Sequence, residues 1–151
     1  MFFRELDKQV LVADSPMRPQ DMAAAAERGV TLAINNRPDG EAFDQVDAAT
    51  LGEAAKAAGL DYRHIPVERE FSSDRVEAML EAMQGAEGRV LIFCKTGTRS
   101  AYLWALARTR DGAMPAAVAG AAARAGYDVR PLLPWMKPRE ETPDGEGTTG
   151  A

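Results

Sequence analysis

The feature that most constrains the fold is Val90–Phe93, a fully apolar run that follows Gly88 and ends at the only cysteine of the chain. A run in which every residue is apolar is typical of a strand whose two faces are both covered. Such strands belong to parallel sheets that carry helices on both sides. The sequence therefore predicts an α/β fold with a central strand at residues 90–93.

The segments around this strand fit the same fold class. Apolar runs predict further strands at residues 10–12, 30–34 and 62–67. Helical spacing and cap residues predict helices over 19–28, 47–58, from 72 or 73 to 83, 100–110 and 115–124. Asp47 is expected to cap the second of these helices, and Ser72 or Ser73 the third. This alternation indicates a single domain with a central, mainly parallel sheet flanked by helices on both faces. Ligands of such sheets bind beyond the carboxyl ends of the strands, where Asn35–Arg37 and Cys94–Arg99 follow two of them.

Length and charge narrow the function classes. We expect one domain over residues 1–136 and a disordered tail over 137–151, where Pro, Glu, Gly and Thr dominate. The net charge of −5 argues against nucleic-acid binding. The N-terminus is charged too early for a signal peptide, and no apolar run approaches the ~20 residues that cross a bilayer. A lone free thiol favours the cytoplasm as the location of the protein. We expect no metal or other cofactor. The sequence does not identify a protein partner.

The chemistry is predicted to lie in the loop Cys94–Ser100, where the apolar strand ends and a helix begins. Backbone N–H groups of such a turn form a concave anion-binding site, and Gly97 permits the positive φ that a tight turn needs. Cys94 would be held there as a thiolate, which is the nucleophilic form. The residues expected to bind the anion are Lys95, Thr96, Gly97 and Thr98.

Several side chains should assist this loop. Arg99 offers a planar fork that can hold an oxyanion through two hydrogen bonds. Ser100 could cap the helix and donate a hydrogen bond to the leaving thiolate. Arg37 could bind substrate, or it could pair with an acidic neighbour, Asp39 or Glu41, to hold its own loop. His64, the only histidine, is expected to make a structural hydrogen bond. The alternative for Cys94, a small core residue, is less consistent with a glycine and an arginine at these spacings.

Four stretches carry a family resemblance: Val30–Glu41, Tyr62–Val67, Cys94–Ser100 and Tyr102–Leu106. With them the chain resembles the bacterial beta-lactamase hydrolase-like protein, phosphatase-like domain family, from about Phe2 to about Arg110. The family is similar in fold to dual-specificity phosphatases, so the resemblance implies a protein-tyrosine-phosphatase-like fold. It also implies a phosphocysteine mechanism, in which Cys94 attacks phosphorus and Arg99 holds the phosphoryl oxygens.

Departures from the phosphatase pattern keep other chemistries open. Those enzymes usually have His before the cysteine and five residues between cysteine and arginine, whereas this chain has Phe93 and four residues. Their general acid is an Asp, but Arg69 falls near that place, so Glu68 or Glu70 becomes the candidate acid. The shorter Cys-x-x-Gly-x-Arg-Ser spacing is typical of rhodanese-like sulfurtransferases, which form a persulfide and need no acid.

Three hypotheses follow from the sequence. The first is a hydrolase that acts on a phosphoester through a phosphocysteine. The second is a sulfurtransferase that takes a sulfur atom onto Cys94 from a sulfane-sulfur donor. The third is a noncatalytic module that binds a small oxyanion.

Overall fold

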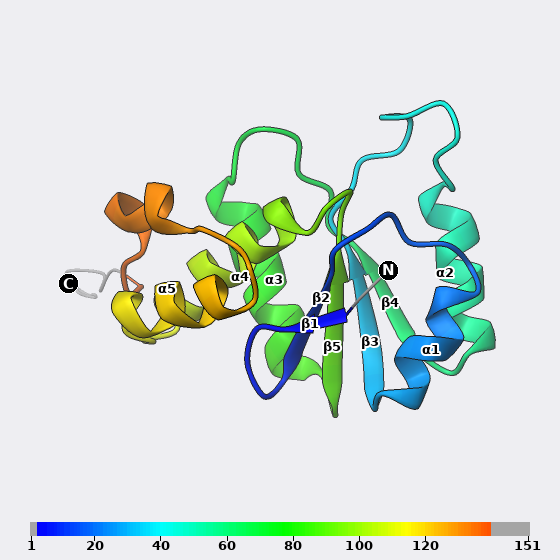
Figure 1. Ribbon diagram of the computed structural model, residues 1–151, viewed down its shortest axis with the longest axis horizontal. Coiled ribbons are helices and arrows are strands. Elements are labelled where there is room, and N and C mark those ends of the chain that lie inside the picture. Colours follow the sequence, from blue (N-terminus) through cyan, green and yellow to red (C-terminus); the bar gives the residue numbers. More distant parts are fainter. Residues whose placement is uncertain (1–2, 140–151) are drawn as a thin grey trace.

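The computed structural model describes residues 3–139 and contains one five-stranded sheet (Figure 1). Its strands are β1 (Phe3–Glu5), β2 (Val10–Ala13), β3 (Val30–Asn35), β4 (Asp61–His64) and β5 (Arg89–Phe93). Their order across the sheet is β1-β2-β5-β3-β4. The pairs β2–β5, β5–β3 and β3–β4 are parallel, and only β1 runs antiparallel to its neighbour. The sheet is therefore mixed but mainly parallel, with β5 at its centre, as the sequence predicts.

Helices cover both faces of the sheet (Figure 1). On one face lie α1 (Asp21–Glu27) and α2 (Ala48–Ala57), and on the other lie α3 (Ser73–Gly85), α4 (Thr98–Arg110) and α5 (Pro115–Arg124). A short 3-10 helix, η1 (Arg130–Trp135), contacts α4. Two of the predicted caps are present, since Asp47 accepts from the amide of Thr50 and Ser72 accepts from the amide of Arg75.

Successive side chains of the central strand β5 point to opposite faces of the sheet, and those of residues 90–93 are buried on both faces. Val90 and Ile92 belong to the core cluster that packs with α3, α4 and α5. Leu91 and Phe93 belong to the second cluster, which packs with α1 and α2. All four are at most 1% exposed. The double burial explains why this segment is apolar throughout, because neither face of β5 meets water.

Several element ends differ from the prediction, and three of these differences concern the site or the sheet edge. Strand β4 ends at His64 instead of Val67, because Pro66 has no backbone N–H with which to continue a regular ladder. Helix α4 begins at Thr98, two residues before the predicted start. The edge strand β1 was not predicted, since it is short and its burial is only partial.

The C-terminal part of the described chain rests on the helical layer. The backbone N–H of Arg139 donates to the carbonyl oxygen of Arg110 at 2.9 Å, and its side chain pairs with Glu77. The predicted disordered tail begins at 137, and its residues 140–151 lie outside the described residues. Within residues 3–139, no helix is long and apolar enough to cross a membrane.

Candidate active site

Three loops meet at the carboxyl edge of the sheet, along the top of Figure 1. The first follows β3 and carries Arg37 and Glu41, the second follows β4 and carries Val67, and the third follows β5 and carries Cys94. Because β3, β4 and β5 are parallel, their carboxyl ends share this edge. The topology thus brings together residues that are far apart in the sequence.

Cys94 lies at the base of the third loop and is 2% exposed. Its Sγ accepts a hydrogen bond from the backbone N–H of Gly97 at 3.2 Å. Gly97 is the N-cap of α4 and has a φ of 94°, so the predicted positive φ is present. Among residues 3–139, the amides of Lys95, Thr96 and Thr98 donate to no acceptor. Unpaired N–H groups at a helix N-terminus attract anions, so the loop has the properties of an oxyanion site.

The loop is packed tightly from behind. A Cβ at Gly97 would lie 2.8 Å from the carbonyl oxygen of Ala13 and 2.9 Å from Cζ of Tyr127. The Tyr127 hydroxyl donates to the carbonyl oxygen of Thr96 at 2.9 Å. Tyr127 comes from beyond α5 and therefore supports the loop from a distant part of the chain. Sequence reasoning missed it, because no motif marks this tyrosine.

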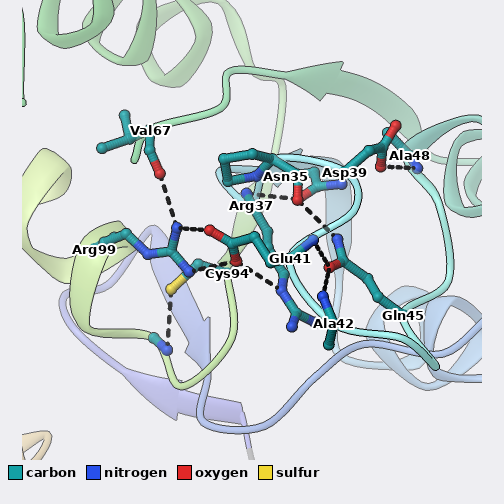
Figure 2. A network of polar contacts seen from close by, with 12 residues as sticks. Asn35, Arg37, Asp39, Glu41, Ala42, Gln45, Ala48, Val67, Cys94 and Arg99 are labelled. Carbon is teal, nitrogen blue, oxygen red and sulfur yellow. Dashed lines mark hydrogen bonds and ion pairs between the residues drawn. The ribbon is translucent and has the colours of Figure 1, made fainter. Parts of the chain in front are cut away.

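Arg99 reaches back from the first turn of α4 toward the other two loops (Figure 2). Its Nη1 donates to Oε2 of Glu41 at 2.7 Å and to the carbonyl oxygen of Val67 at 2.8 Å, and its Nη2 donates to Oε1 of Glu41 at 2.9 Å. These bonds use three of the five guanidinium N–H donors. The Nε–H and one Nη2–H are left, and they lie along the same edge of the guanidinium plane. That edge can still bind an oxyanion through two hydrogen bonds.

The charges and hydrogen bonds of Glu41 and Cys94 both affect the pKa of Arg99. The hydrogen bonds that Glu41 accepts from Arg99, followed by the charge of the Cys94 sulfur, raise the pKa of Arg99 against the opposing effect of burial. In return, the hydrogen bonds from Arg99, and more weakly those from Arg37, lower the pKa of Glu41. Glu41 is therefore an ionised carboxylate at neutral pH and cannot serve as a general acid there. Sequence reasoning named Glu41 only as a possible partner of Arg37.

Ser100 has a different partner from the one expected. Its hydroxyl donates to Oδ1 of Asn36 at 2.7 Å, and the residue is fully buried. The prediction that Ser100 caps the helix is wrong, because Gly97 holds the N-cap position. Asn36 also donates to the carbonyl oxygen of Ile65, so it links the loops after β3, β4 and β5. In this structure a bond from Ser100 to the Cys94 sulfur would require the bond to Asn36 to break.

Arg37 pairs with Glu41, which is one of the two roles expected for it. Its Nε donates to Oε1 of Glu41 at 3.0 Å. The backbone on either side is fixed, because the Arg37 amide donates to Asn35 and the Arg37 carbonyl oxygen is bonded to Nε2 of His64. The expected structural hydrogen bond of His64 is thus present.

The two candidate acids lie in the loop after β4. Glu68 and Glu70 are exposed and make no side-chain hydrogen bond with any other described residue. Both line a shallow hollow whose wall also includes Val67, the residue that accepts from Arg99. Elsewhere in the described chain, no cluster of three or more His, Cys, Asp or Glu residues could hold a metal ion.

Comparison with known proteins places this chain in a family. The model of the family described as "Beta-lactamase hydrolase-like protein, phosphatase-like domain" matches residues 3–111. A beta-lactamase hydrolase-like protein from Xylella fastidiosa (strain Temecula1) is 33% identical over 138 residues, which cover 88% of this chain. Those residues are 31% of the relative, so the chain spans about a third of the length of the curated proteins that it matches.

Solved structures show the same fold. The crystal structure of a "putative phosphatase" from Neisseria meningitidis has a TM-score of 0.78 and 28% identity, and the match covers 89% of this chain and 95% of that one. The crystal structure of PTPMT1 has a TM-score of 0.65 at 16% identity, covering 90% of this chain and 92% of that one. The domain therefore has a protein-tyrosine-phosphatase-like fold.

Proposed function

The chain belongs to the beta-lactamase hydrolase-like protein, phosphatase-like domain family, and from this membership we propose that it is a cysteine-dependent phosphatase whose nucleophile is Cys94. The observation that carries the proposal is the arrangement around the Cys94 sulfur. The amide of Gly97 donates to that atom, the amides of Lys95, Thr96 and Thr98 in the same loop are unpaired, and the guanidinium of Arg99 lies beside Cys94 (Figure 2). They supply donors for the three non-bridging oxygens of a phosphoryl group in its transition state.

The reaction would proceed in two steps. The Cys94 thiolate attacks phosphorus, an S–P bond forms, and the P–O bond to the leaving alcohol breaks with its electron pair on oxygen. Water then attacks the phosphocysteine, inorganic phosphate leaves, and the thiolate is restored. The Nε–H and Nη2–H of Arg99 hold two phosphoryl oxygens throughout, while Glu41 keeps the guanidinium in the required plane.

The leaving alkoxide needs a proton, and the candidates for the acid remain Glu68 and Glu70. Both are exposed residues on the loop that also supplies the Val67 carbonyl to Arg99. Closure of this loop over a bound phosphoester would bring one of them toward the leaving oxygen. Glu41 does not fit the role, because its hydrogen bonds from Arg99 keep it ionised.

The proposal is tested with nitrophenyl phosphate, since its leaving group is stable without an acid. We expect the wild-type chain to hydrolyse it and Cys94→Ser to show no measurable turnover. Circular dichroism serves as the control for an unchanged fold. Turnover by Cys94→Ser at the wild-type rate would show that the sulfur is not the nucleophile.

Two observations favour a second function, rhodanese-like sulfur transfer. Within residues 3–139 the only carboxylate that bonds Arg99 is Glu41, which is ionised and so cannot act as the acid that a phosphatase needs. The loop also has only four residues between Cys94 and Arg99. Sulfur transfer from thiosulfate needs no acid, because sulfite leaves as a stable anion. In that reaction the outer sulfur would bond to the Cys94 thiolate as sulfite departs. Rapid thiosulfate-to-cyanide transfer without phosphoester hydrolysis would favour this function over the first.

A further inference from the structure

A cavity of about 520 Å³ opens beside Cys94, on the side of the loop that follows β3. Cys94 and Lys95 form part of its wall, together with Arg18, Arg37 and Asp44. Arg99 is not among the lining residues. The cavity therefore adjoins the nucleophile but is separate from the guanidinium that would hold the reacting phosphoryl group.

Arg37 is the residue in this wall that has hydrogen-bond donors available for a ligand. Its side chain is 8% exposed, and its only side-chain hydrogen bond runs from Nε to Glu41. Neither Nη nitrogen has a partner among residues 3–139. In Figure 2 the Nη end of this guanidinium turns away from Glu41 and Arg99. Neither Nη nitrogen is fully buried, and Arg37 lines the cavity, so their four N–H donors are available there to an anion.

The site is also rigid and positive. The backbone of Arg37 is fixed by Asn35 and His64, so the side chain starts from a defined position. Arg18 and Lys95 add positive charge to the wall, whereas Asp44 removes one. A preformed pocket with an excess of cations loses little entropy when it binds an anion.

A single phosphoryl group cannot bind to the Nη end of Arg37 and to the Cys94 site at the same time. The carboxylate of Glu41 lies between the two guanidinium groups, since Oε1 accepts from both Arg37 Nε and Arg99 Nη2. The open edge of Arg99 adjoins Cys94, and the open end of Arg37 lies on the other side of Glu41 (Figure 2). Two separate anions, or two anionic groups of one molecule, are needed to use both.

We propose that the cavity binds a second anionic group of the substrate through the Nη donors of Arg37, so that the substrate class is a phosphomonoester that carries a further phosphate or carboxylate. This inference rests on the proposed function, because it takes the first phosphoryl group to lie at Cys94. Lys95 and Arg18 would add weaker contacts at the rim. A phosphomonoester with a neutral leaving group would leave the Nη donors of Arg37 to water and gain nothing from them.

The test measures binding of inert phosphonates to the wild-type chain by calorimetry. Methylphosphonate is compared with a series of alkane diphosphonates in which the linker lengthens from one carbon to four. At least one diphosphonate should bind about tenfold tighter than methylphosphonate, as expected for one added charge-assisted contact. In Arg37→Met the preference should fall to near unity. If that variant does not fold, Arg37→Lys serves in its place and should lose most of the preference, since Lys lacks the fork.

A further variant separates this site from a general effect of charge. Lys56→Gln removes a positive charge from the exposed last turn of α2, outside the cavity, and should keep the preference for the diphosphonate. Absence of any preference in the wild type, or a loss in Lys56→Gln equal to that in Arg37→Met, would overturn the inference.

Failure of the proposed function would look different. Phosphonate binding requires no turnover, so a preference that depends on Arg37 would stand even if nitrophenyl phosphate were not hydrolysed. Conversely, hydrolysis that depends on Cys94, together with equal affinity for all the phosphonates, would leave the phosphatase standing and remove the second subsite.

Discussion

The carboxylate of Glu41 accepts hydrogen bonds from two arginines that belong to different loops. Its side chain is 28% exposed, and its Oε1 is shared between Arg37 and Arg99. Glu41 occupies the end of the Arg99 fork and leaves the Nε edge open. A bound carboxylate in this place could either fix the arginine for catalysis or compete with an incoming anion. The donor count favours the first role, because two donors of Arg99, beside Cys94, have no oxygen acceptor among residues 3–139.

Replacement of Glu41 distinguishes these two roles. We expect Glu41→Gln to lower kcat/KM for nitrophenyl phosphate by about 5- to 30-fold, because a charge-assisted pair worth roughly 1–2 kcal/mol no longer fixes Arg99. Because the fold lowers the pKa of Glu41, the support that Glu41 gives to Arg99 depends on pH in a defined direction. The carboxylate supports Arg99 above its ordinary pKa of 4.5, and this support is lost as pH falls through the lower value in the fold. A rise in kcat/KM would instead mean that Glu41 competes with substrate.

The geometry of Arg99 matters more than its charge. Three donors are committed to Glu41 and Val67, and the remaining two point along one edge. We expect Arg99→Lys to recover little of the activity lost in Arg99→Ala, since one ammonium group cannot serve both sets of acceptors. The loss should be about 30- to 1,000-fold in kcat/KM, or roughly 2–4 kcal/mol of transition-state stabilisation. Near-complete recovery by lysine would mean that only positive charge is needed.

At the scale of elements, the junction of β5 and α4 is the part of the fold on which the site depends. The strand is fixed by burial on both faces, and the loop between strand and helix is fixed from behind by Ala13 and Tyr127. The free amides of the helix N-terminus are thereby held in one place before any ligand binds. Such preorganisation is what an oxyanion site requires.

Gly97 is the most sensitive position of this junction. A side chain there would meet the carbonyl oxygen of Ala13 and the ring of Tyr127, and the φ of 94° disfavours every residue except glycine. We expect Gly97→Ala to destabilise the fold by about 1–3 kcal/mol in urea unfolding and to abolish turnover. Gly85→Ala is the matched control, because nothing lies within contact of its Cβ and its φ is not positive. Activity retained in Gly97→Ala would show that the loop tolerates another shape.

Asp7 connects the turn after β1 to the helical layer. Burial raises the pKa of Asp7, but hydrogen bonds from Arg108, from Trp104 and from the backbone outweigh it, so the pKa lies below its ordinary 3.8. We expect Asp7→Asn to lower the free energy of unfolding by about 1–3 kcal/mol at neutral pH. The stabilisation is present above 3.8 and is lost as pH falls through the lower value in the fold.

Urea unfolding at several pH values checks this prediction. The difference between wild type and Asp7→Asn should shrink as the solution is acidified below the ordinary pKa of the carboxyl group. Glu53→Gln, on the exposed side of α2, provides the control and should change the free energy of unfolding little at any pH. A difference independent of pH would indicate that folding does not lower the pKa of Asp7.

Over the whole molecule, sequence patterns predicted those features that depend only on residues close together in the chain. The apolar run of β5, the caps at Asp47 and Ser72 and the contiguous Cys94–Arg99 loop were all recognisable in the sequence. The partners of that loop were not, because they arise from tertiary pairing. Glu41 lies 58 residues from Arg99 along the chain. No spacing rule connects two such positions, and only the parallel pairing of β3 with β5 brings their loops to one edge.

The same limit explains the errors. Ser100 was assigned to the cap from its place after the loop, yet the tight turn at Gly97 starts the helix earlier and directs the Ser100 hydroxyl to Asn36. Strand β1 gives no local signal, because it is a short edge strand with only three paired residues. Its pairing with β2 is again a tertiary contact.

The central claim, that Cys94 accepts a phosphoryl group, is tested most directly by the mass of the trapped intermediate. The wild-type chain is mixed with nitrophenyl phosphate, quenched in denaturant at mildly alkaline pH, and measured intact and as peptides. We predict the mass of one added phosphoryl group, located on the peptide that contains Cys94 and absent from Cys94→Ser. A chain that gains no phosphoryl group, but gains one sulfur atom on Cys94 from thiosulfate, would contradict the phosphatase and establish the persulfide.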